Sequence, residues 1–151
     1  VGVEKDFDEA LTWFIKAADK GNALAQYNIG NLYAIGGGRI TKDFDTAFTW
    51  FKKSAEQGDD LAQGQLGMFY RDGLGVTQDD EQSCYWFEKA AAQGHEDSIL
   101  WAGILHIKLK SFEGAAFFIS IARKVGNDEA EKLWNKYELS NHLKPTFNFR
   151  D

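Results

Sequence analysis

The sequence predicts an all-α protein, and more specifically an α/α right-handed superhelical solenoid of helix-turn-helix repeats. Three observations predict this fold. Residue types recur at intervals of 37 and 36 positions, as Trp13, Trp50 and Trp86 show. Each recurring segment places apolar residues at helical spacing. The 151-residue chain also contains a single proline, Pro145, so its helices lack the residue that most often breaks them.

The repeat is clearest when the segments that begin at Leu11 and Phe48 are aligned. The residue types that coincide at a spacing of 37 are, in the first segment, Trp13, Phe14, Gly21, Ala25, Gln26, Gly30 and Tyr33. A third copy contains Trp86, Phe87, Gly94 and Gly103, with His106 at the tyrosine position. A weaker fourth copy begins at Ala115. Such self-similarity is typical of stacked repeats, in which each unit buries its apolar face against its neighbours.

Each copy is expected to form two amphipathic helices. The apolar or small residues of the first helix fall on one face, at Ala10, Trp13, Phe14, Ala17 and Ala18. We therefore expect the recurring tryptophans, Trp13, Trp50 and Trp86, to pack in the core. The second helix has its own stripe, formed by Ala25, Ile29, Leu32 and Tyr33. Gly30, within that helix, permits close approach of a neighbour.

The expected helix ends follow the same period. Glycines suited to the left-handed residue that ends a helix recur at Gly21, Gly58, Gly94 and Gly126. The next residue is an expected N-cap at Asn22, Asp59 and Asn127, whereas His95 does not fit the capping rule. The glycine-rich segments 36–38 and 73–75 are expected turns, because neither has the Gly-Lys-Ser/Thr ending of a phosphate-binding loop.

These elements predict one repeat domain with a short tail. The expected divisions are a solenoid at 1–138, made of a partial repeat at 1–20, repeats at about 21–57, 58–93 and 94–125 and a capping helix at 127–138, and a tail at 139–151. The opening residues resemble the loop after Gly75, so we expect the chain to start inside a repeat. The third unit replaces the glycine loop with Leu109 to Phe112.

Composition excludes several classes of function. The formal net charge is −6, which repels nucleic acid. No run of about 18 apolar residues is present, so no membrane span is expected. The one cysteine, Cys84, has no partner for an internal disulfide. We expect no small-molecule cofactor, and the composition leaves the compartment undecided.

Candidate catalytic and metal-binding residues are few. Cys84 is expected on a helix with no cysteine or histidine at ligand spacing, which favours a small buried or half-buried thiol over a nucleophile. His106 is interpreted as a packed aromatic residue. His95, Glu96 and Asp97 are adjacent at a helix start, where they do not face one another as zinc ligands would. We therefore expect no metal site and no catalytic residues.

The recurring residues resemble those of the Sel-one-like repeat family, a relative of the tetratricopeptide repeat. The resemblance is carried by the Trp-Phe pair, the Lys-Ala-Ala and Gln-Gly segments, the Ala-Gln start of the second helix and the Gly-x-Gly-Val loop, and it covers residues 2 to about 138. It implies a superhelix in which the first helix of each repeat, counted from the repeat starts at about 21, 58 and 94, lines a concave side. Asn135, where earlier units have a glycine, indicates a terminal capping helix.

The residues expected to face a partner lie just off the core stripe of that concave helix. In successive units they are Leu24, Tyr27, Asn28 and Asn31, then Leu61, Gly64, Gln65 and Met68, then Asp97, Leu100, Trp101 and Ile104. Large apolar residues at positions that usually carry Lys or Glu indicate an exposed binding strip. The alternative is that neighbouring repeats cover Leu24 and Leu61 as core. Trp101 favours binding, because tryptophan often anchors interfaces.

The resemblance implies a protein-binding scaffold or adaptor that holds a protein or peptide and performs no catalysis. One alternative is a bacterial inhibitor or immunity protein that caps a toxic effector enzyme, which the acidic composition would suit if the target is basic. A second alternative is a hydrolase, an activity proposed for cysteine-rich relatives. Those relatives carry a repeated cysteine pair, and this chain has only Cys84.

Overall fold

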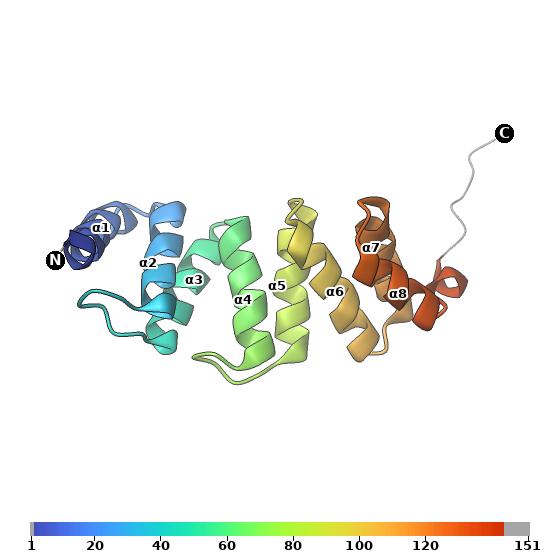
Figure 1. Ribbon diagram of the computed structural model, residues 1–151. Helices are drawn as coiled ribbons and strands as arrows, with labels where there is room; N and C mark the ends of the chain where they lie inside the picture. Colours follow the sequence, from blue (N-terminus) through green and yellow to red (C-terminus); the bar gives the residue numbers. More distant parts are fainter. Residues whose placement is uncertain (1, 144–151) are drawn as a thin grey trace.

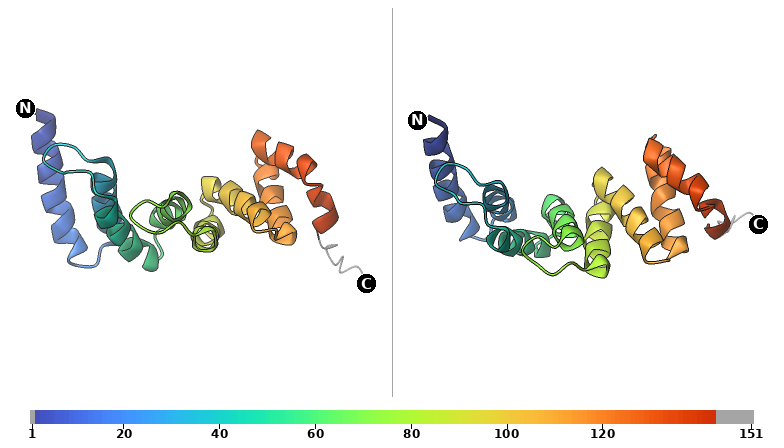
Figure 2. Two further views of the ribbon diagram at one scale, coloured as in Figure 1. Left: turned by 90° about the horizontal axis from the view of Figure 1, so that it is seen from below. Right: turned by 60° about the horizontal axis from the view of Figure 1, so that its bottom comes forward.

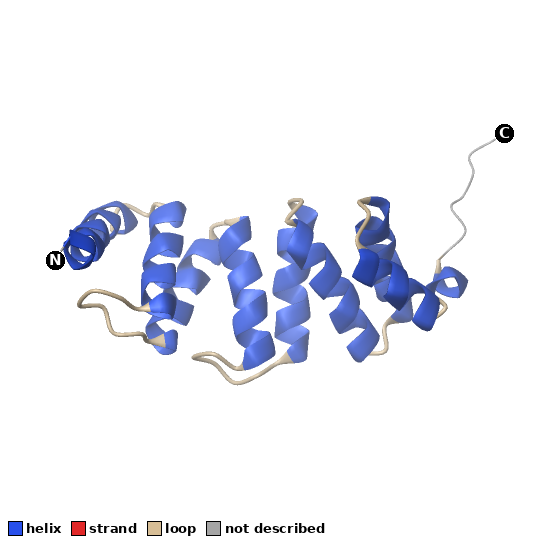
Figure 3. Cartoon of the chain, viewed as in Figure 1, coloured by secondary structure: helices blue, strands red, loops and turns tan. Residues whose placement is uncertain are grey.

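The structure is a computed structural model that describes residues 2–143, with side chains described from Phe7 onward. The described residues form an all-α protein, as predicted, with α-helices connected by short loops (Figures 1 and 3). The helices are α1 (Gly2–Ala18), α2 (Ala23–Ile35), α3 (Phe44–Glu56), α4 (Asp60–Asp72), α5 (Asp80–Ala92), α6 (Glu96–Lys108), α7 (Phe112–Lys124) and α8 (Asp128–Lys136), followed by the 3₁₀-helix η1 (Leu139–His142).

Each helix packs mainly against the helices that precede and follow it in the chain. The result is an elongated row with α1 and α8 at opposite ends, as Figures 1 and 2 show. The buried core is accordingly divided into several clusters along the row. This arrangement is that of a solenoid, in which stability comes from contacts between neighbouring units.

A close contact between a glycine and a large side chain recurs along the row. The ring of Phe51 on α3 lies against Gly30 on α2, and the ring of Phe87 on α5 lies against Gly67 on α4. At the third position Ile119 on α7 lies against Gly103 on α6. In each case a β-carbon on the glycine would lie less than 3.0 Å from the opposing side chain. The helix glycines of the repeat therefore permit the close packing that their spacing predicted.

Buried glutamines connect successive helices at two places. Gln26 on α2 donates to the carbonyl oxygen of Ala18 and accepts a hydrogen bond of 2.7 Å from Gln57, which follows α3. Gln63 on α4 repeats the arrangement, because it donates to the Ala55 carbonyl and accepts from Gln93 at 2.9 Å. Each pair satisfies polar groups that would otherwise be costly to bury, and it fixes three consecutive helices together.

The helix ends agree with the predicted caps except at His95. The side chains of Asn22, Asp59 and Asn127 accept hydrogen bonds from the backbone at the starts of α2, α4 and α8. The expectation that His95 fails as a cap is wrong, because its Nδ1 accepts the Ser98 N–H at the start of α6. An imidazole nitrogen can accept such a bond, which the usual list of capping residues omits.

The prediction that the recurring tryptophans pack in the core is correct for Trp86 and wrong for Trp13. Trp86 is buried against the cluster formed by α3 and α4, and Trp50 is half-buried against the cluster formed by α1 and α2. Trp13 is 62% exposed, with the Lys16 ammonium 4.7 Å from its ring centroid. The physical reason is that each tryptophan is covered by the preceding helix pair, and no described helix precedes α1.

The loops follow the glycine pattern. Gly36, Gly37 and Gly38 have positive φ in the loop from α2 to α3, and Gly73 and Gly75 do so after α4. The corresponding loop after α6 is short and turns at Lys110, with φ of 59°. Of the predicted tail, Leu139 is buried against α7 and α8, whereas Pro145, Phe147 and Phe149 lie outside the described residues.

Within residues 2–143, no helix is both long and apolar enough to cross a membrane.

Candidate functional site

A hollow of about 290 Å³ opens on the side of the row formed by α2, α4 and α6. It is lined by Tyr27, Leu61, Gly64, Gln65, Met68, Phe87, His95, Asp97 and Trp101. Apart from Phe87 on α5 and the capping residue His95, the lining comes from those three helices, each of which is the first helix of its predicted repeat. The structure thus brings together Tyr27, Leu61, Gly64, Gln65, Met68, Asp97 and Trp101 from the predicted binding residues.

The apolar lining is partly open to solvent. Leu61 is 40% exposed and Met68 is 38% exposed, although both belong to residue types that are usually buried. Tyr27 is half-buried, with its ring centroid 5.8 Å from that of Phe51. Leu61, Met68 and Tyr27 thus place partly exposed apolar side chains in one hollow. Exposed apolar side chains gathered in this way are typical of a binding surface.

Trp101 forms a fixed wall of the hollow. Its ring stacks on Phe87, with centroids 6.2 Å apart and an interplanar angle of 18°, and it is half-buried. The Arg71 guanidinium lies 4.1 Å from the Trp101 ring centroid, a favourable cation–π distance. A large aromatic side chain held on two sides offers its remaining surface to a partner at little cost in conformational entropy.

The floor and polar edge of the hollow come from small and titratable residues. Gly64 is buried, and a β-carbon there would lie 3.3 Å from Cε1 of His95, so the glycine leaves room beside the imidazole. Asp97 is exposed at the start of α6. Its carboxylate contributes a negative charge at the edge of an otherwise apolar and amide-lined surface.

Other predicted binding residues lie outside this hollow. Leu24 is 55% exposed near the start of α2, and Asn28, Asn31 and Ile104 are half-buried elsewhere on α2 and α6. Leu100 lines a different hollow, between the start of α6 and the end of α7, and packs against the cluster of α7 and α8. The predicted strip is therefore only partly gathered into one surface.

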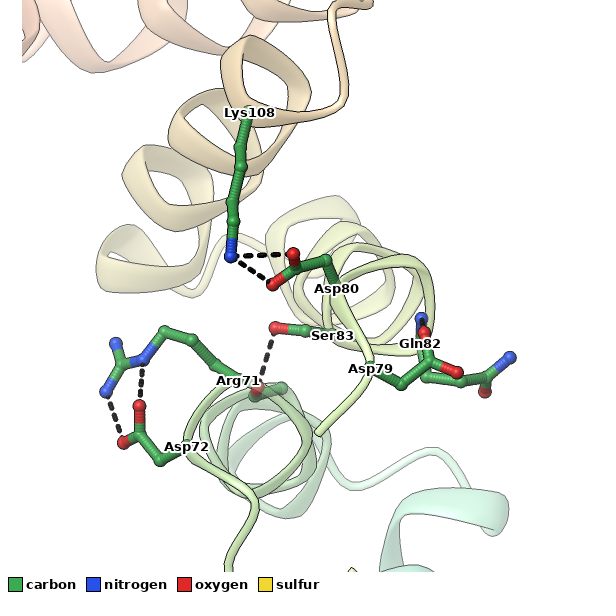
Figure 4. A network of polar contacts seen from close by, with 8 residues as sticks. Arg71, Asp72, Asp79, Asp80, Gln82, Ser83 and Lys108 are labelled. Carbon is green, nitrogen blue, oxygen red and sulfur yellow. Dashed lines mark hydrogen bonds and ion pairs between the residues drawn. The ribbon is translucent and has the colours of Figure 1, made fainter. Parts of the chain in front are cut away.

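Two ion pairs lie at the ends of α4, α5 and α6 (Figure 4). Arg71 and Asp72 form a two-pronged pair, with both N···O distances 2.7 Å. The hydrogen bonds from Arg71 hold the pKa of the Asp72 carboxyl below its usual range. Lys108 on α6 bonds Asp80 on α5 at 2.6 Å, which joins the two helices near their ends. Arg71, which contacts Trp101, is thereby oriented by a carboxylate.

A second group of titratable side chains, which the sequence did not predict, lies between α5 and α6. His106 Nε2 lies 2.6 Å from Glu88 Oε1, and Cys84 Sγ lies 3.9 Å from the same oxygen. Cys84 is buried, and burial, followed by the charge of Glu88, raises the pKa of its thiol to about 12. The His106 ring also stacks on Phe118, so its interpretation as a packed aromatic is correct but incomplete.

A signal for this group is present in the repeat. Cys84 and His106 occupy the positions of Phe48 and Tyr70 in the preceding unit, 22 residues apart in both cases. Those two rings are in edge contact, with centroids 5.4 Å apart. Because equivalent positions in stacked repeats have equivalent neighbours, the contact between residues 84 and 106 follows from the repeat alignment once the contact between Phe48 and Tyr70 is known.

An uninterrupted row of helix pairs with a hollowed face on one side defines a helical repeat protein of the scaffold class. The family model described as Sel1 repeat matches residues 1–22, 23–59 and 60–95. The chain therefore belongs to the Sel1 repeat family. A comparison with curated proteins gave no match.

Two solved structures share this fold. One is a Sel1 repeat protein from Oxalobacter formigenes, with 30% sequence identity and a TM-score of 0.75, covering 93% of this chain and 59% of that one. The other is c5321, described as a protective antigen present in uropathogenic Escherichia coli strains displaying an SLR fold, with 29% identity and a TM-score of 0.78. The match covers 89% of this chain and 30% of c5321, so the chain spans less than two thirds of the length of either structure.

Proposed function

We propose that this chain is a scaffold that holds a protein or peptide segment in the hollow bounded by Tyr27, Leu61, Met68 and Trp101, and that it catalyses no reaction. The observation that carries the proposal is that side chains from three successive helix pairs line one partly exposed apolar surface. A repeat scaffold presents such extended surfaces to partners.

The chemistry of the hollow indicates what the partner offers. Its apolar lining suits a large aliphatic or aromatic side chain, and the Gln65 amide can bond a backbone group of the partner. Asp97 is the carboxylate among the lining residues, which favours a Lys or Arg next to the apolar anchor. We therefore propose a segment that combines one large apolar residue with a nearby basic residue.

The proposal includes the absence of catalysis. For Cys84, the one cysteine of the chain, the pKa of the thiol supports this part. A thiol with a pKa of about 12 is protonated at neutral pH, and the thiolate is the nucleophilic form. Cys84 beside His106 is therefore unsuited to attack a substrate. A panel of ester, amide and phosphoester substrates should show no turnover by the purified chain, and turnover that disappears in Cys84→Ala would refute this part.

Peptide selection tests the binding proposal directly. Peptides selected from a random library on the wild-type chain should contain the apolar and basic pair, and their affinity, measured by fluorescence anisotropy, should fall at least about tenfold with Leu61→Asp or Trp101→Ala. Leu109→Asp is the matched control, because Leu109 is 39% exposed yet lies outside the hollow. Circular dichroism should show the same helix content in all four proteins. Unchanged affinity in both hollow variants would refute the proposed site.

The net charge of −6 favours a second candidate, an inhibitor that caps a basic effector enzyme. The two candidates differ in what binding does to the partner. An inhibitor should abolish the enzymatic activity of its captured partner, and its association rate should fall steeply as salt is raised from low to physiological concentration. A scaffold should leave the activity of its partner intact.

A further inference from the structure

We infer that Cys84, Glu88 and His106 form a binding site for one Zn²⁺ ion between α5 and α6. The three residues offer a sulfur, an oxygen and a nitrogen that all lie within 4.8 Å of one another. Thiolate, imidazole and carboxylate are the three protein ligands that zinc prefers. The site lies apart from the hollow, and the inference does not depend on the proposed binding of a protein or peptide.

The geometry needs only small side-chain movements to accept the ion. Zinc binds sulfur at about 2.3 Å and nitrogen or oxygen at about 2.0–2.2 Å, so its tetrahedral ligand atoms lie about 3.3–3.7 Å apart. Here Sγ to Oε1 is 3.9 Å and Nε2 to Oε1 is 2.6 Å. The ion would lie between Glu88 and His106, whose neutral imidazole would carry its proton on Nδ1. Glu88 Oε1 and His106 Nε2 would then move apart by less than about 1 Å.

The local helical geometry fixes the ligands before an ion arrives. Cys84 and Glu88 are four residues apart on α5, so they face the same side one turn from each other. His106 projects from α6, where its ring stacks on Phe118 and rests against Gly114, at which a β-carbon would collide with it. The fourth side of the ion would face solvent, because the Glu88 side chain is 40% exposed. A water molecule can therefore supply the fourth ligand.

Comparison with the preceding repeat unit supports a specific role for this group. The equivalent positions there hold Phe48, Lys52 and Tyr70, an aromatic pair beside a cation. In the third unit all three are replaced together by residues that ligate zinc. If these positions served only packing, an aromatic pair such as Phe48 and Tyr70 would be sufficient. If they served only a salt bridge between Glu88 and His106, the buried sulfur of Cys84 would not be needed.

Binding has a defined proton balance. The Cys84 thiol loses its proton as the Zn–S bond forms, and Glu88 binds as the carboxylate. His106 binds through Nε2 as the neutral tautomer that keeps its one proton on Nδ1, so the imidazole releases none. One proton per ion should therefore appear in solution when the thiol starts protonated and the imidazole starts neutral. No oxidant or reductant is involved.

Titration of the untagged, EDTA-treated full chain with ZnCl₂ tests the site. Calorimetry should show one ion per chain, and Co²⁺ in place of Zn²⁺ should give a thiolate-to-metal charge-transfer band. Cys84→Ala and His106→Tyr should each weaken zinc binding by more than about a hundredfold, since even supporting residues contribute tenfold or more. Tyrosine is the residue that the earlier units carry at this position, so His106→Tyr is expected to fold.

Two controls separate ligation from folding. His95→Asn removes a histidine outside the group and restores the cap type of Asn22, so it should bind zinc as the wild type does. Glu88→Gln keeps a partly exposed, similarly sized side chain and should weaken binding with an unchanged circular dichroism spectrum. The inference is overturned if the wild type takes up no stoichiometric Zn²⁺, if Co²⁺ gives no thiolate band, or if folded Cys84→Ala or His106→Tyr binds zinc undiminished.

Discussion

The ring of Phe87 lies against the backbone of Gly67, so closely that a β-carbon at residue 67 would lie 2.7 Å from the ring. Phe87 is among the most deeply buried side chains in the described part of the chain. The contact joins α4 to α5 and has counterparts at Gly30 and Gly103. It explains why the residue with the poorest helix propensity after proline recurs in the middle of these helices.

Gly67→Ala should therefore destabilise the protein although alanine is the better helix former. The gain of about 1 kcal/mol in helix propensity is outweighed by overpacking of up to about 3 kcal/mol, which leaves a net loss of about 1–2 kcal/mol in the free energy of unfolding. Urea denaturation followed by circular dichroism measures it. Gly64→Ala, on the same helix, would place its β-carbon 3.3 Å from His95 Cε1, a much milder contact, so it should destabilise the protein less than Gly67→Ala. Equal effects of the two changes would contradict the packing explanation.

Asp59→Ala should destabilise the protein through loss of a helix cap. Asp59 Oδ1 accepts the Ala62 N–H at 2.8 Å, at the start of α4. The expected loss is about 1 kcal/mol in the free energy of unfolding. Asp60→Ala changes an adjacent carboxylate without removing the capping bond, so it should cost less in the same urea experiment. A larger effect at residue 60 than at residue 59 would argue against capping.

Asp72→Asn should reduce the loss of stability in acid. The hydrogen bonds from Arg71 lower the folded-state pKa of Asp72 from 3.8, so this carboxyl stabilises the fold above its unfolded pKa. That contribution is lost as pH falls through the lowered folded value. Because the pair is partly exposed, the effect should stay below about 1 kcal/mol. Unfolding free energies at pH 7 and pH 3 measure it, and an equal loss in the wild type and the variant would refute the assignment.

Cys84 should be nearly inert to alkylation in the folded protein. Burial and the charge of Glu88 raise its thiol pKa from 9.0 to about 12, which lowers the thiolate fraction at neutral pH by about a thousandfold. Mass spectrometry after iodoacetamide treatment in EDTA should show slow labelling that becomes fast in urea. Glu88→Gln should label faster than the wild type, because it removes the repelling charge. Fast labelling of the folded wild type would show that the thiol is accessible and ionised.

The helical fold could be predicted from the sequence because its determinants are periodic. Gly30 and Gly67 stand 37 residues apart, and the large residues that face them, Phe51 and Phe87, recur in nearly the same interval. A strand pattern would need alternation at every second residue, which these segments lack. The caps at Asn22 and Asp59 could be predicted in the same way, from a local bond that depends only on neighbouring residues.

The parts that escaped prediction depend on contacts across units. Trp13 shares the local pattern of Trp86, yet its exposure depends on which helix lies beside it, and the pattern of one helix does not contain that information. The proximity of Cys84 to His106 likewise arises from helix packing and not from spacing along one helix. Of the predicted binding strip, Leu61 and Trp101 share a hollow whereas Leu100 lines another, because adjacent residues point about 100° apart around a helix.

The glutamine bonds have a mechanical consequence. Amide bonds have preferred directions and so resist twisting, whereas apolar contacts resist only separation. Gln63 and Gln93 connect α3, α4 and α5, but the equivalent positions one unit later are Ile99 and Val125. Glutamine bonds of this kind therefore connect α1 to α5 but cannot form where α7 joins α6, and we expect twisting between helices to be easier at that joint.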